Sequence, residues 1–244
     1  MTLRKRSPRR SHGRFGPPFP SRATTSPAPR ECCEVKVVLI DYGAGNLHSV
    51  QKALVAAEIP PVVSSDPNDL DDADAIVLPG QGHFGQVAEA FAASGFAPRV
   101  REHLAASRPF LGICVGLQLL MERSDEAPGV AGLGLIAGRV RRFPDAGPSV
   151  PHMGWNSLHP VGASPLLEGI PDGAHAYFAH SYYAEFLEQE WSGAYTRYGD
   201  VTFLSAVSRG AVHATQFHPE KSQRVGLHVL RRFGIVARQA ARRS

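Results

Sequence analysis

Residues 109–118 read PFLGICVGLQ, a short apolar run that ends in Gly-x-Cys-x-Gly and continues with helical spacing to residue 122. This is the sequence form of a nucleophile elbow, a tight turn from a strand into a helix with a small residue on each side of the nucleophile. Such a turn lifts the side chain of Cys114 off the edge of the sheet, and the start of the helix favours the thiolate, which is the attacking form. The stretch therefore predicts a strand–turn–helix unit that presents a cysteine nucleophile.

A base for this thiol lies about a hundred residues later, in the stretch TQFHPE at 215–220. Proline pushes the residue before it into an extended conformation, and in extended chain residues i and i+2 point to the same side. Glu220 can therefore lie beside the His218 ring, fix its tautomer and stabilise the imidazolium. A small buried cysteine or a surface turn would explain either motif alone. Together in one chain they favour a triad of Cys114, His218 and Glu220.

Apolar runs alternate with helical patterns through the first half of the chain. We expect strands at 35–40, 61–64, 75–78 and 109–113, and helices that begin near 47 and cover 84–93 and 97–106. A β-α-β-α order indicates a parallel sheet with helices on both faces. Ligands bind such sheets beyond the carboxyl ends of the strands. The glycine-rich turn 43–46, the loop 80–82 and Cys114 all lie at that edge.

Between about 133 and 217 the pattern changes to strands without intervening helices. The expected strands cover 133–140, 176–186 and 201–207, with turns at 145–148 and 198–200. They read as an antiparallel extension of the same sheet. The last element is a helix that opens at Ser222, a good N-cap, with an apolar stripe of Val225, Val229, Phe233 and Val236. The predicted fold class is a single-domain α/β protein with an open, mostly parallel sheet.

Length and cysteine content limit the class of protein. A chain of 244 residues is long enough for one substantial core, and no apolar run approaches the roughly 18 residues of a membrane span. Three cysteines, two of them adjacent at 32 and 33, do not make a disulfide framework. A free catalytic thiolate points to a reducing compartment, so we expect a cytoplasmic protein with no membrane partner.

The net charge of +4 is concentrated in the first 30 residues, which hold eight Lys and Arg and no Asp or Glu. The rest of the chain then carries 18 basic against 22 acidic side chains, which gives no reason to expect nucleic acid. We expect three segments: a disordered basic extension at 1–34, the folded domain at 35–238 and a basic tail at 239–244. The extension reads as dispensable or as a start codon assigned too early; an organelle transit peptide and a nucleic-acid-binding arm are the alternatives.

Several motifs resemble one enzyme family. The stretch 112–118 with His218-Pro219-Glu220 resembles the triad (class I) glutamine amidotransferases, which release ammonia from glutamine. Three further stretches, DYGAGN at 41–46, PHMGWN at 151–156 and YFAHSY at 177–182, narrow the likeness to the glutaminase subunits of imidazole glycerol phosphate synthase. The resemblance covers residues 35 to about 236 and implies a flavodoxin-like class I amidotransferase fold.

The resemblance also implies a reaction and its residues. Cys114 attacks the side-chain amide of L-glutamine to form a thioester, His218 protonates the departing ammonia and then activates water, and Glu220 orients the imidazole. The oxyanion needs preorganised donors. The N–H of Val115 and the glycine loop would supply them, and four further side chains would hold glutamine. The implied substrate residues are Gly80, Gly82, Val115, Gln118, His180, Ser181 and Tyr182.

By the same resemblance the ammonia passes to a cyclase subunit, a (β/α)8 barrel that forms a heterodimer with this chain. The cyclase makes imidazole glycerol phosphate and AICAR in histidine biosynthesis. Asn46, Trp155 and Lys221 would lie on the interface. Trp155 could also be a core tryptophan, and His180 and Tyr182 could simply be packed on a strand. No histidine shows metal-ligand spacing, so we expect neither a metal nor another cofactor.

Two features depart from the family pattern. The oxyanion loop has Gln81 where an apolar residue is common, and the family usually begins at the first strand. The alternatives are a glutaminase that serves another acceptor, as in anthranilate or pyridoxal phosphate synthesis, a stand-alone cysteine hydrolase, or a non-catalytic binding module. Asn46, Trp155 and Asn156 argue against another acceptor, and the intact triad argues against a binding module.

Overall fold

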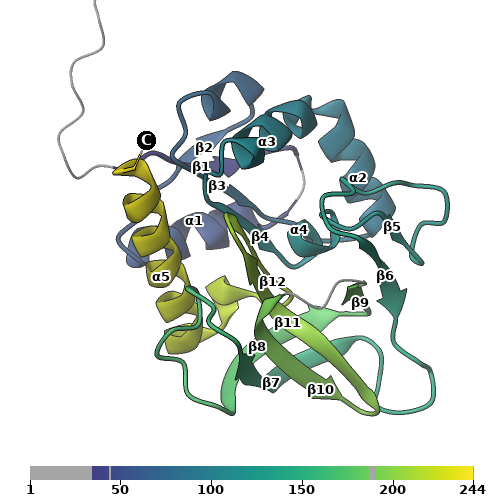
Figure 1. Cartoon of the computed structure of the whole chain (residues 1–244). Helices are drawn as coiled ribbons and strands as arrows, with labels where there is room; N and C mark the ends of the chain where they lie inside the picture. The colour runs from purple at the N-terminus through teal and green to yellow at the C-terminus, as the bar shows by residue number, and fades with distance from the viewer. Residues whose placement is uncertain (1–34, 44, 187–190, 244) are drawn as a thin grey trace, which may run out of the picture. The chain divides into compact units, whose positions relative to one another are not determined.

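A computed structural model describes residues 35–43, 45–186 and 191–243. Two sheets form this part of the chain, one of nine strands in the order β2-β1-β3-β4-β12-β11-β10-β7-β8 and one of three in the order β5-β6-β9 (Figure 1). The expectations for residues 1–34 and for Ser244 fall outside the described residues. The predicted fold class, an α/β protein with a mostly parallel sheet and an antiparallel extension, is confirmed.

Five parallel strands make up one half of the large sheet. They are β1 (Val37–Ile40), β2 (Val62–Ser64), β3 (Ala75–Leu78), β4 (Phe110–Ile113) and β12 (Val212–Thr215). Every residue of β1, β3 and β4 is buried, as expected for strands that are covered on both faces. The first four strands follow the order 2-1-3-4 of flavodoxin-like sheets. We call these five strands and their helices the parallel half.

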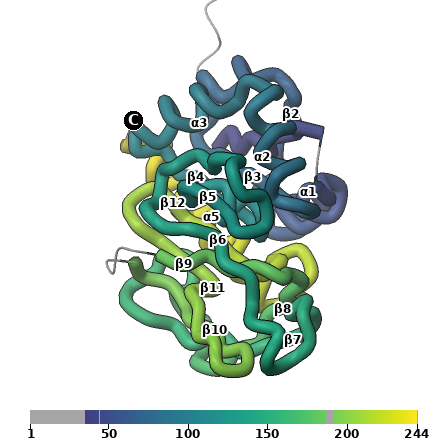
Figure 2. Tube along the Cα trace, turned by 90° about the vertical axis from the view of Figure 1, so that its right-hand side faces the viewer, coloured from purple at the N-terminus to yellow at the C-terminus, as the bar shows by residue number. Residues whose placement is uncertain are grey.

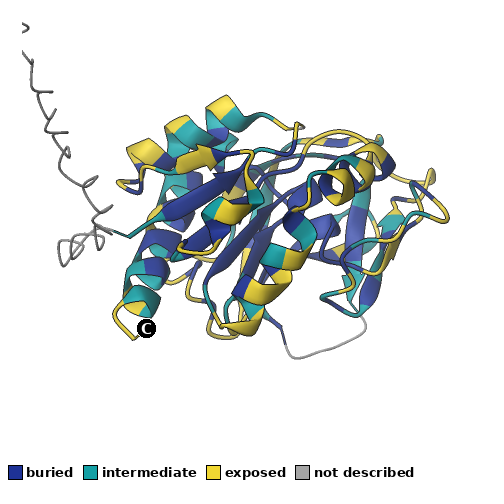
Figure 3. Ribbon diagram, turned by 90° about the horizontal axis from the view of Figure 1, so that it is seen from above, coloured by how far each residue is buried: buried dark blue, intermediate teal, exposed yellow. Residues whose placement is uncertain are grey.

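Helices cover both faces of the parallel half. The helix α1 (Leu47–Ala56) packs against α5 (Gln223–Ala241), and α2 (Phe84–Ala93) packs against α3 (Phe96–Ala105). Because right-handed crossovers run from β1 outward to β2 and from β3 the other way to β4, α1 and the α2–α3 pair lie on opposite faces. Figure 3 shows the buried strands between helices whose outer faces are exposed. The short 3-10 helix η1 (Pro67–Leu70) joins β2 to β3.

The antiparallel half continues the sheet from β12. It consists of β11 (Val201–Arg209), β10 (Ser192–Tyr198), β7 (His152–Val161) and β8 (Ala174–His180), each antiparallel to its neighbour. In Figure 2 these strands lie below the parallel half. The predicted extension is therefore correct, although the sequence patterns did not indicate β7, β10 or β12.

A second sheet lies beside the large one. It pairs β5 (Arg123–Ser124) with β6 (Gly138–Arg142), and β6 with β9 (Tyr182–Phe186). The prediction of one strand over 176–186 is wrong, because the chain leaves the large sheet at Ser181 and enters the small one as β9. This break puts Ser181 at a corner between two sheets.

Two other boundaries differ from expectation. The predicted strand at 133–140 begins only at Gly138, because residues 133–136 bond to the end of the elbow helix instead: the Leu133 N–H donates to Leu119 O and the Leu135 N–H to Leu120 O. The helix after the elbow is a single turn, α4 (Val115–Gln118), rather than a run to residue 122.

The last helix starts where predicted, but Ser222 does not cap it. Its hydroxyl donates to His218 O and accepts from Tyr177 N instead. Val229 and Phe233 of the predicted stripe are fully buried, whereas Val225 and Val236 are half-buried at its margins. The helix extends to Ala241, into the stretch expected as a tail.

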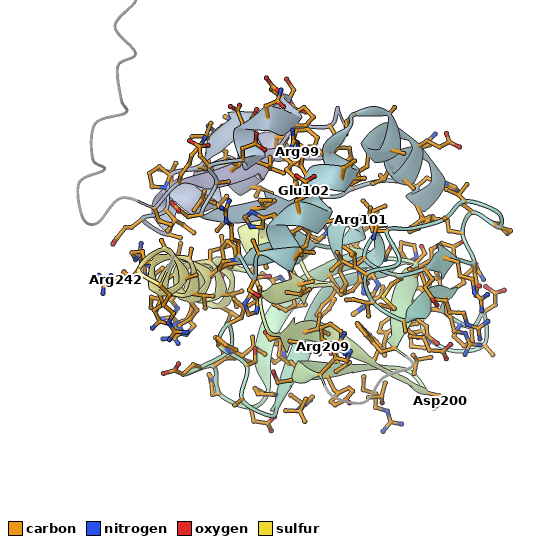
Figure 4. All side chains as sticks on the ribbon, turned by 45° about the horizontal axis from the view of Figure 1, so that its top comes forward. Arg99, Arg101, Glu102, Asp200, Arg209 and Arg242 are labelled. Carbon is orange, nitrogen blue, oxygen red and sulfur yellow. The ribbon has the colours of Figure 1, made fainter. Side chains whose placement is uncertain are left out.

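Several charged side chains lie on the outside of the fold. Figure 4 shows Arg99 and Glu102 together on α3, where the guanidinium and carboxylate are 2.9 Å apart. Glu102 is exposed and Arg99 is half-buried at the surface, and such pairs contribute little to stability. Among the described residues, no helix is long and apolar enough to cross a membrane.

Candidate active site

Cys114 lies at the turn between β4 and α4 with a strained backbone, at φ +53° and ψ −108°. Its side chain is 3% exposed. The flanking glycines are required by contact distances. A Cβ on Gly116 would lie 2.2 Å from Leu78 O, and one on Gly112 would lie 2.8 Å from Gly116 O. Positive φ at a residue other than glycine is unfavourable and typical of functional turns, so the local sequence holds the thiol in a conformation that the surrounding sheet enforces.

The pairing of β4 with β12 brings the histidine to the thiol. Ile113 is the register partner of Thr215, and the Cys114 N–H donates to Thr215 O at 2.7 Å. His218 follows three residues later, with its own N–H donating to Tyr177 O at 3.0 Å. Both candidate residues therefore stand at the carboxyl ends of adjacent parallel strands, where α/β proteins bind ligands.

The His218 ring lies between Cys114 and Glu220. Its Nδ1 is 2.8 Å from Glu220 Oε1, and the two side chains are 4% and 2% exposed. Burial lowers the pKa of His218, but hydrogen bonds and charge interactions with Cys114 and Glu220 outweigh it and raise the pKa to about 10. The imidazolium is thus the favoured form at neutral pH, held between a carboxylate and the sulfur. This arrangement can store and deliver a proton beside a nucleophile.

Two buried amides extend the cluster around the sulfur. Gln216 Nε2 donates to Cys114 Sγ at 3.7 Å, while Gln216 Oε1 accepts from Gln118 Nε2 at 3.3 Å. Gln118 Nε2 also donates to Tyr182 O at 3.0 Å. The amide nitrogen of Gln118 is therefore bonded within the protein, and its oxygen is the atom left to accept from a ligand. Gln216 was not singled out from the sequence, because nothing but its polarity marks it within the stretch TQFHPE.

A cavity of about 210 Å³ opens over the sulfur. This is below the roughly 300–1,000 Å³ of sites for drug-sized ligands, and it suits a small metabolite. Six of the residues predicted to bind substrate or form the oxyanion hole line it with Cys114: Gly82, Val115, Gln118, His180, Ser181 and Tyr182.

The loop that follows β3 lies directly on the elbow. A Cβ on Gly80 would be 2.5 Å from Gly116 N, so only glycine allows this approach. Gly82 has φ +107° and open space around it. The buried Tyr42 hydroxyl donates to Pro79 O at 2.7 Å, and burial raises the pKa of Tyr42, so this donor stays protonated. The loop is thus anchored at Pro79 and free of packing at Gly82. The N–H of Val115, at the start of α4, has no intrahelical partner.

Glu126 is a cavity residue that the sequence did not reveal. It is the one carboxylate among the described residues that line the cavity, and its Oε2 accepts from Phe84 N at 2.7 Å at the start of α2. It comes from an irregular loop with no motif around it, so only the fold places it there.

The residues predicted at a partner interface are partly clustered. Trp155 is 47% exposed on β7, and its neighbour Met153 is 65% exposed, so the interpretation of Trp155 as a core residue is wrong. The rings of Trp155 and Tyr177 are 6.0 Å apart, and Lys221 Nζ is 5.9 Å from the Tyr177 ring. We call Trp155, Tyr177 and Lys221 the aromatic–lysine cluster. Asn46 lies outside it; its Oδ1 caps α1, which packs against the turn that carries Lys221.

Metal coordination finds no support in the part of the chain that the structure describes. No group of three or more His, Cys, Asp or Glu side chains there is arranged to hold an ion.

Comparisons of the sequence with known proteins agree on one enzyme family. A family model described as "Glutamine amidotransferase class-I" matches residues 38–237. "Imidazole glycerol phosphate synthase subunit HisH" of Deinococcus radiodurans is 53% identical over 199 residues, which is 81% of this chain and 92% of that protein. A protein of the same name from Thermus thermophilus is 52% identical over 197 residues, covering 80% of this chain and 95% of its own length.

Solved structures agree at the level of the fold. A structure titled "Crystal structure of glutamine amidotransferase" superposes with a TM-score of 0.65 at 22% identity, covering 82% of this chain and 98% of the other. "Structure of PurLQS from Thermotoga maritima" gives a TM-score of 0.64 at 18% identity, covering 84% and 97%. At these identities the likeness supports the architecture alone.

Proposed function

Because the chain belongs to the class I glutamine amidotransferases, and within them to the HisH subunits of imidazole glycerol phosphate synthase, we propose that it hydrolyses L-glutamine and delivers the ammonia to a cyclase subunit. The observation that carries the proposal is the strained Cys114 at the mouth of the cavity, beside a His218 that Glu220 holds as an imidazolium. The product of the partner's reaction would be imidazole glycerol phosphate together with AICAR, in histidine biosynthesis.

The reaction follows from the positions of these three groups. The Cys114 thiolate adds to the side-chain amide carbon of glutamine, and the electron pair of the C=O bond moves to the oxygen. His218 gives its proton to the amide nitrogen, the C–N bond breaks, and ammonia leaves a glutamyl thioester. The now neutral imidazole takes a proton from water, whose oxygen attacks the thioester carbon. Glutamate departs and the thiolate–imidazolium pair is restored.

Two acceptors in the cavity lining fit the amino-acid end of glutamine. Gln118 Oε1 and the Glu126 carboxylate would accept hydrogen bonds from the α-ammonium group, and the carboxylate adds charge attraction. Ser181 and Tyr182 also line the cavity, and the Tyr182 carbonyl lies next to Gln118. Both nitrogens of His180 are bonded within the protein, so His180 would shape the wall rather than bond to glutamine.

The oxyanion would be stabilised by two backbone donors. The Val115 N–H is one, and a peptide of the Gly80–Gly82 loop is the second. With Gly80 fixed against the elbow and Gly82 unpacked, the peptides around Gln81 are the ones free to turn. We propose that this loop turns when the cyclase substrate is bound, which would make glutamine hydrolysis depend on the partner. Gln81, which is polar and exposed, would influence which orientation of the loop is favoured when the cyclase substrate is not bound.

The proposed partner is a (β/α)8 cyclase subunit that forms a heterodimer through the aromatic–lysine cluster and Asn46. An exposed tryptophan beside an exposed methionine is a typical interface anchor. The cluster is also close to the chemistry, because the backbone of Tyr177 accepts the hydrogen bond of His218 N. Ammonia released at Cys114 would leave toward this surface. The need for a free thiolate places the reaction in a reducing compartment, which we take to be the cytoplasm.

The test is a glutaminase assay of the chain alone and with the cyclase subunit and its ribonucleotide substrate. One missing oxyanion donor costs about 10²–10³ in rate, so we expect activation of that order. Equal rates for the isolated chain and the complex would instead indicate a stand-alone hydrolase. Activation by an anthranilate or pyridoxal phosphate synthase in place of the cyclase would assign the ammonia to another acceptor.

A matched pair of variants tests the docking surface in the same assay. Trp155→Ala should weaken association by more than about 2 kcal/mol, the usual loss at a central interface aromatic. Val55→Ala is the control, because Val55 is equally exposed at 53% but lies at the other end of α1 from Asn46. The docking surface is misplaced if both variants bind the cyclase as tightly as the wild type.

A further inference from the structure

Two buried histidines face each other across β7 and β8. His152 and His180 are direct register partners, and they are 3% and 6% exposed. His152 Nδ1 lies 3.1 Å from His180 Nε2, and His180 Nδ1 lies 2.8 Å from Tyr182 O. His180 lines the candidate glutamine cavity, whereas His152 stands behind it.

The hydrogen bonds fix the tautomers of both rings. A backbone carbonyl only accepts, so His180 carries its proton on Nδ1 to donate to Tyr182 O. Burial lowers the pKa of His180 to about 3 and that of His152 to about 4, so both rings are neutral. The Nε2 of His180 must then accept, His152 must donate from Nδ1, and His152 Nε2 is left as an acceptor.

Asn156 forms the other end of this chain of hydrogen bonds. Its Nδ2 donates to His152 Nε2 at 3.1 Å and to Arg197 O at 3.0 Å, while its Oδ1 accepts from Ser157 N at 2.8 Å. The reversed amide would set its NH2 group against the Ser157 N–H and its oxygen against the Arg197 carbonyl. Only one orientation satisfies all three neighbours, so the direction of the whole chain is determined from both ends.

The surroundings leave no alternative partner. The His152 ring is stacked between Phe178, at 4.6 Å between centroids, and Tyr198, at 4.0 Å. Phe143 and Phe203 pack against the His180 ring at 5.3 and 5.4 Å. Both rings are almost fully buried among these aromatic side chains, so the loss of the bond between them leaves a buried polar atom unpaired.

This chain of hydrogen bonds ends at the Tyr182 carbonyl, which also binds the side chain of Gln118. Tyr182 O accepts from both His180 Nδ1 and Gln118 Nε2, and Gln118 continues to Gln216 and the Cys114 sulfur. We propose that His152 is a positioning residue for glutamine binding: by fixing the tautomer of His180, it holds the Tyr182 carbonyl and thereby the amide of Gln118 in the orientation that receives the substrate. Its other end, Asn156, adjoins Trp155, so the same chain ties the cavity to the strand that carries the proposed docking surface.

The first experiment needs neither partner nor substrate. Nitrogen-15 NMR of the isolated full chain, with the histidine rings assigned, distinguishes Nδ1–H from Nε2–H tautomers. We expect His180 as the Nδ1–H form and His152 as the Nδ1–H form between pH 6 and 8. A His180 that is protonated at Nε2, or doubly protonated, in this range would overturn the proposal.

The second experiment measures KM and kcat for glutamine in the complex with the cyclase. His152→Phe keeps a ring but leaves His180 Nε2 without a donor, and the loss of one buried hydrogen bond predicts a KM raised about tenfold with kcat within about twofold. His152→Asn restores a donor near the Nδ1 position and should recover most of the affinity. The rate of Cys114 alkylation by iodoacetamide should be unchanged in both variants.

His103→Phe is the matched control, because His103 is 2% exposed, is also neutral by burial, and bonds one backbone carbonyl, Pro109 O, outside the chain of bonds. It should lower stability but not change KM. Equal KM values for His152→Phe and His103→Phe would overturn the positioning role. The second experiment rests on the proposed function: a wild-type complex that hydrolyses no glutamine would refute that function, whereas the NMR result would still decide the tautomer chain.

Discussion

The two halves of the sheet each bury histidines near the cavity, and they hold them in opposite charge states. His218, beyond the end of β12, has a pKa raised to about 10, whereas His152 and His180, on β7 and β8, have values lowered to about 4 and about 3. Burial lowers the pKa in all three cases. The difference comes from the neighbours: a carboxylate and a thiol beside His218, and carbonyls, amides and aromatic rings around the other two. Burial alone therefore does not determine the charge of a histidine.

The same contrast appears in how each half presents its polar groups. Strands β1, β3 and β4 of the parallel half are apolar and buried throughout, so the polar side chains of the site come from the turns beyond the strands, as with Cys114 and His218. Strands of the antiparallel half alternate, so its polar side chains come from the strands themselves, as with His152 and His180. We infer that the first half moves protons, while the second half holds the shape of the cavity.

The largest effect should follow from removing the nucleophile of the parallel half. Cys114→Ala should lower glutamine hydrolysis by at least about 10⁴-fold, because the covalent route is lost. The antiparallel half is untouched, so cyclase binding and synthesis from added ammonia should remain. Steady-state rates with glutamine and with ammonium salts separate the two. Retention of a tenth of the glutaminase activity would show that another group carries the reaction.

The contrast in charge gives a second test by NMR titration. His218 should remain protonated at pH 8, while His152 and His180 should remain neutral at pH 5.5. For His218 the raised pKa means that its contribution to stability is complete below about pH 6.5 and is lost as the pH rises through about 10. For His152 and His180 the lowered pKa has the opposite effect on stability. Below about pH 6.5 these side chains bind a proton in the unfolded chain but stay neutral in the folded protein, so the free energy of unfolding falls on acidification.

The same contrast can be tested by measuring the free energy of unfolding of matched variants in urea between pH 5 and 7. A histidine that stays neutral in the folded protein lowers the free energy of unfolding by about 2 kcal/mol at pH 5, because in the unfolded chain its pKa is near 6.5 and it binds a proton. His152→Asn should therefore reduce the loss of stability on acidification, whereas His218→Asn should not. The comparison between the halves fails if all three rings titrate near pH 6.5.

The sequence predicted the parallel half well because its signals are local. Its strands β1, β3 and β4 are apolar runs with a glycine or proline close to one end, and the elbow and the His-Pro-Glu stretch are motifs of a few residues. The pairing of His218 with Glu220 was also predicted, but its geometry was only half right: His218 is extended, whereas Pro219–Lys221 turn as a short 3-10 helix, η2, from which Glu220 reaches the ring. Even so β12 was not predicted, since four residues that include His213 and Thr215 form no apolar run.

The antiparallel half was predicted only in outline because its partners are distant in the chain. The pairing of His152 with His180 spans 28 residues, and the change of sheet at Ser181 is decided by what each strand pairs with. Glu126 and Gln216 have no local signal of a site role apart from their polarity. Contacts of this kind arise from tertiary packing, which periodicity does not encode.

The smallest predicted effect comes from removing a single tyrosine hydroxyl, and it can be compared between the two halves. Tyr42→Phe removes a buried hydrogen bond to Pro79 O, which should lower the free energy of unfolding by about 1 kcal/mol. Because this bond anchors the loop that would complete the oxyanion hole, we also expect the activation by the cyclase to change several-fold. Tyr198→Phe is the control in the other half, since it removes an exposed hydroxyl's bond to a backbone carbonyl, Ser149 O, and keeps the ring that stacks on His152. It should affect stability no more than Tyr42→Phe does and leave the activation ratio unchanged. If the two variants change that ratio equally, the anchor at Pro79 has no role in switching, and the loop must be controlled by Gln81 or by the partner alone.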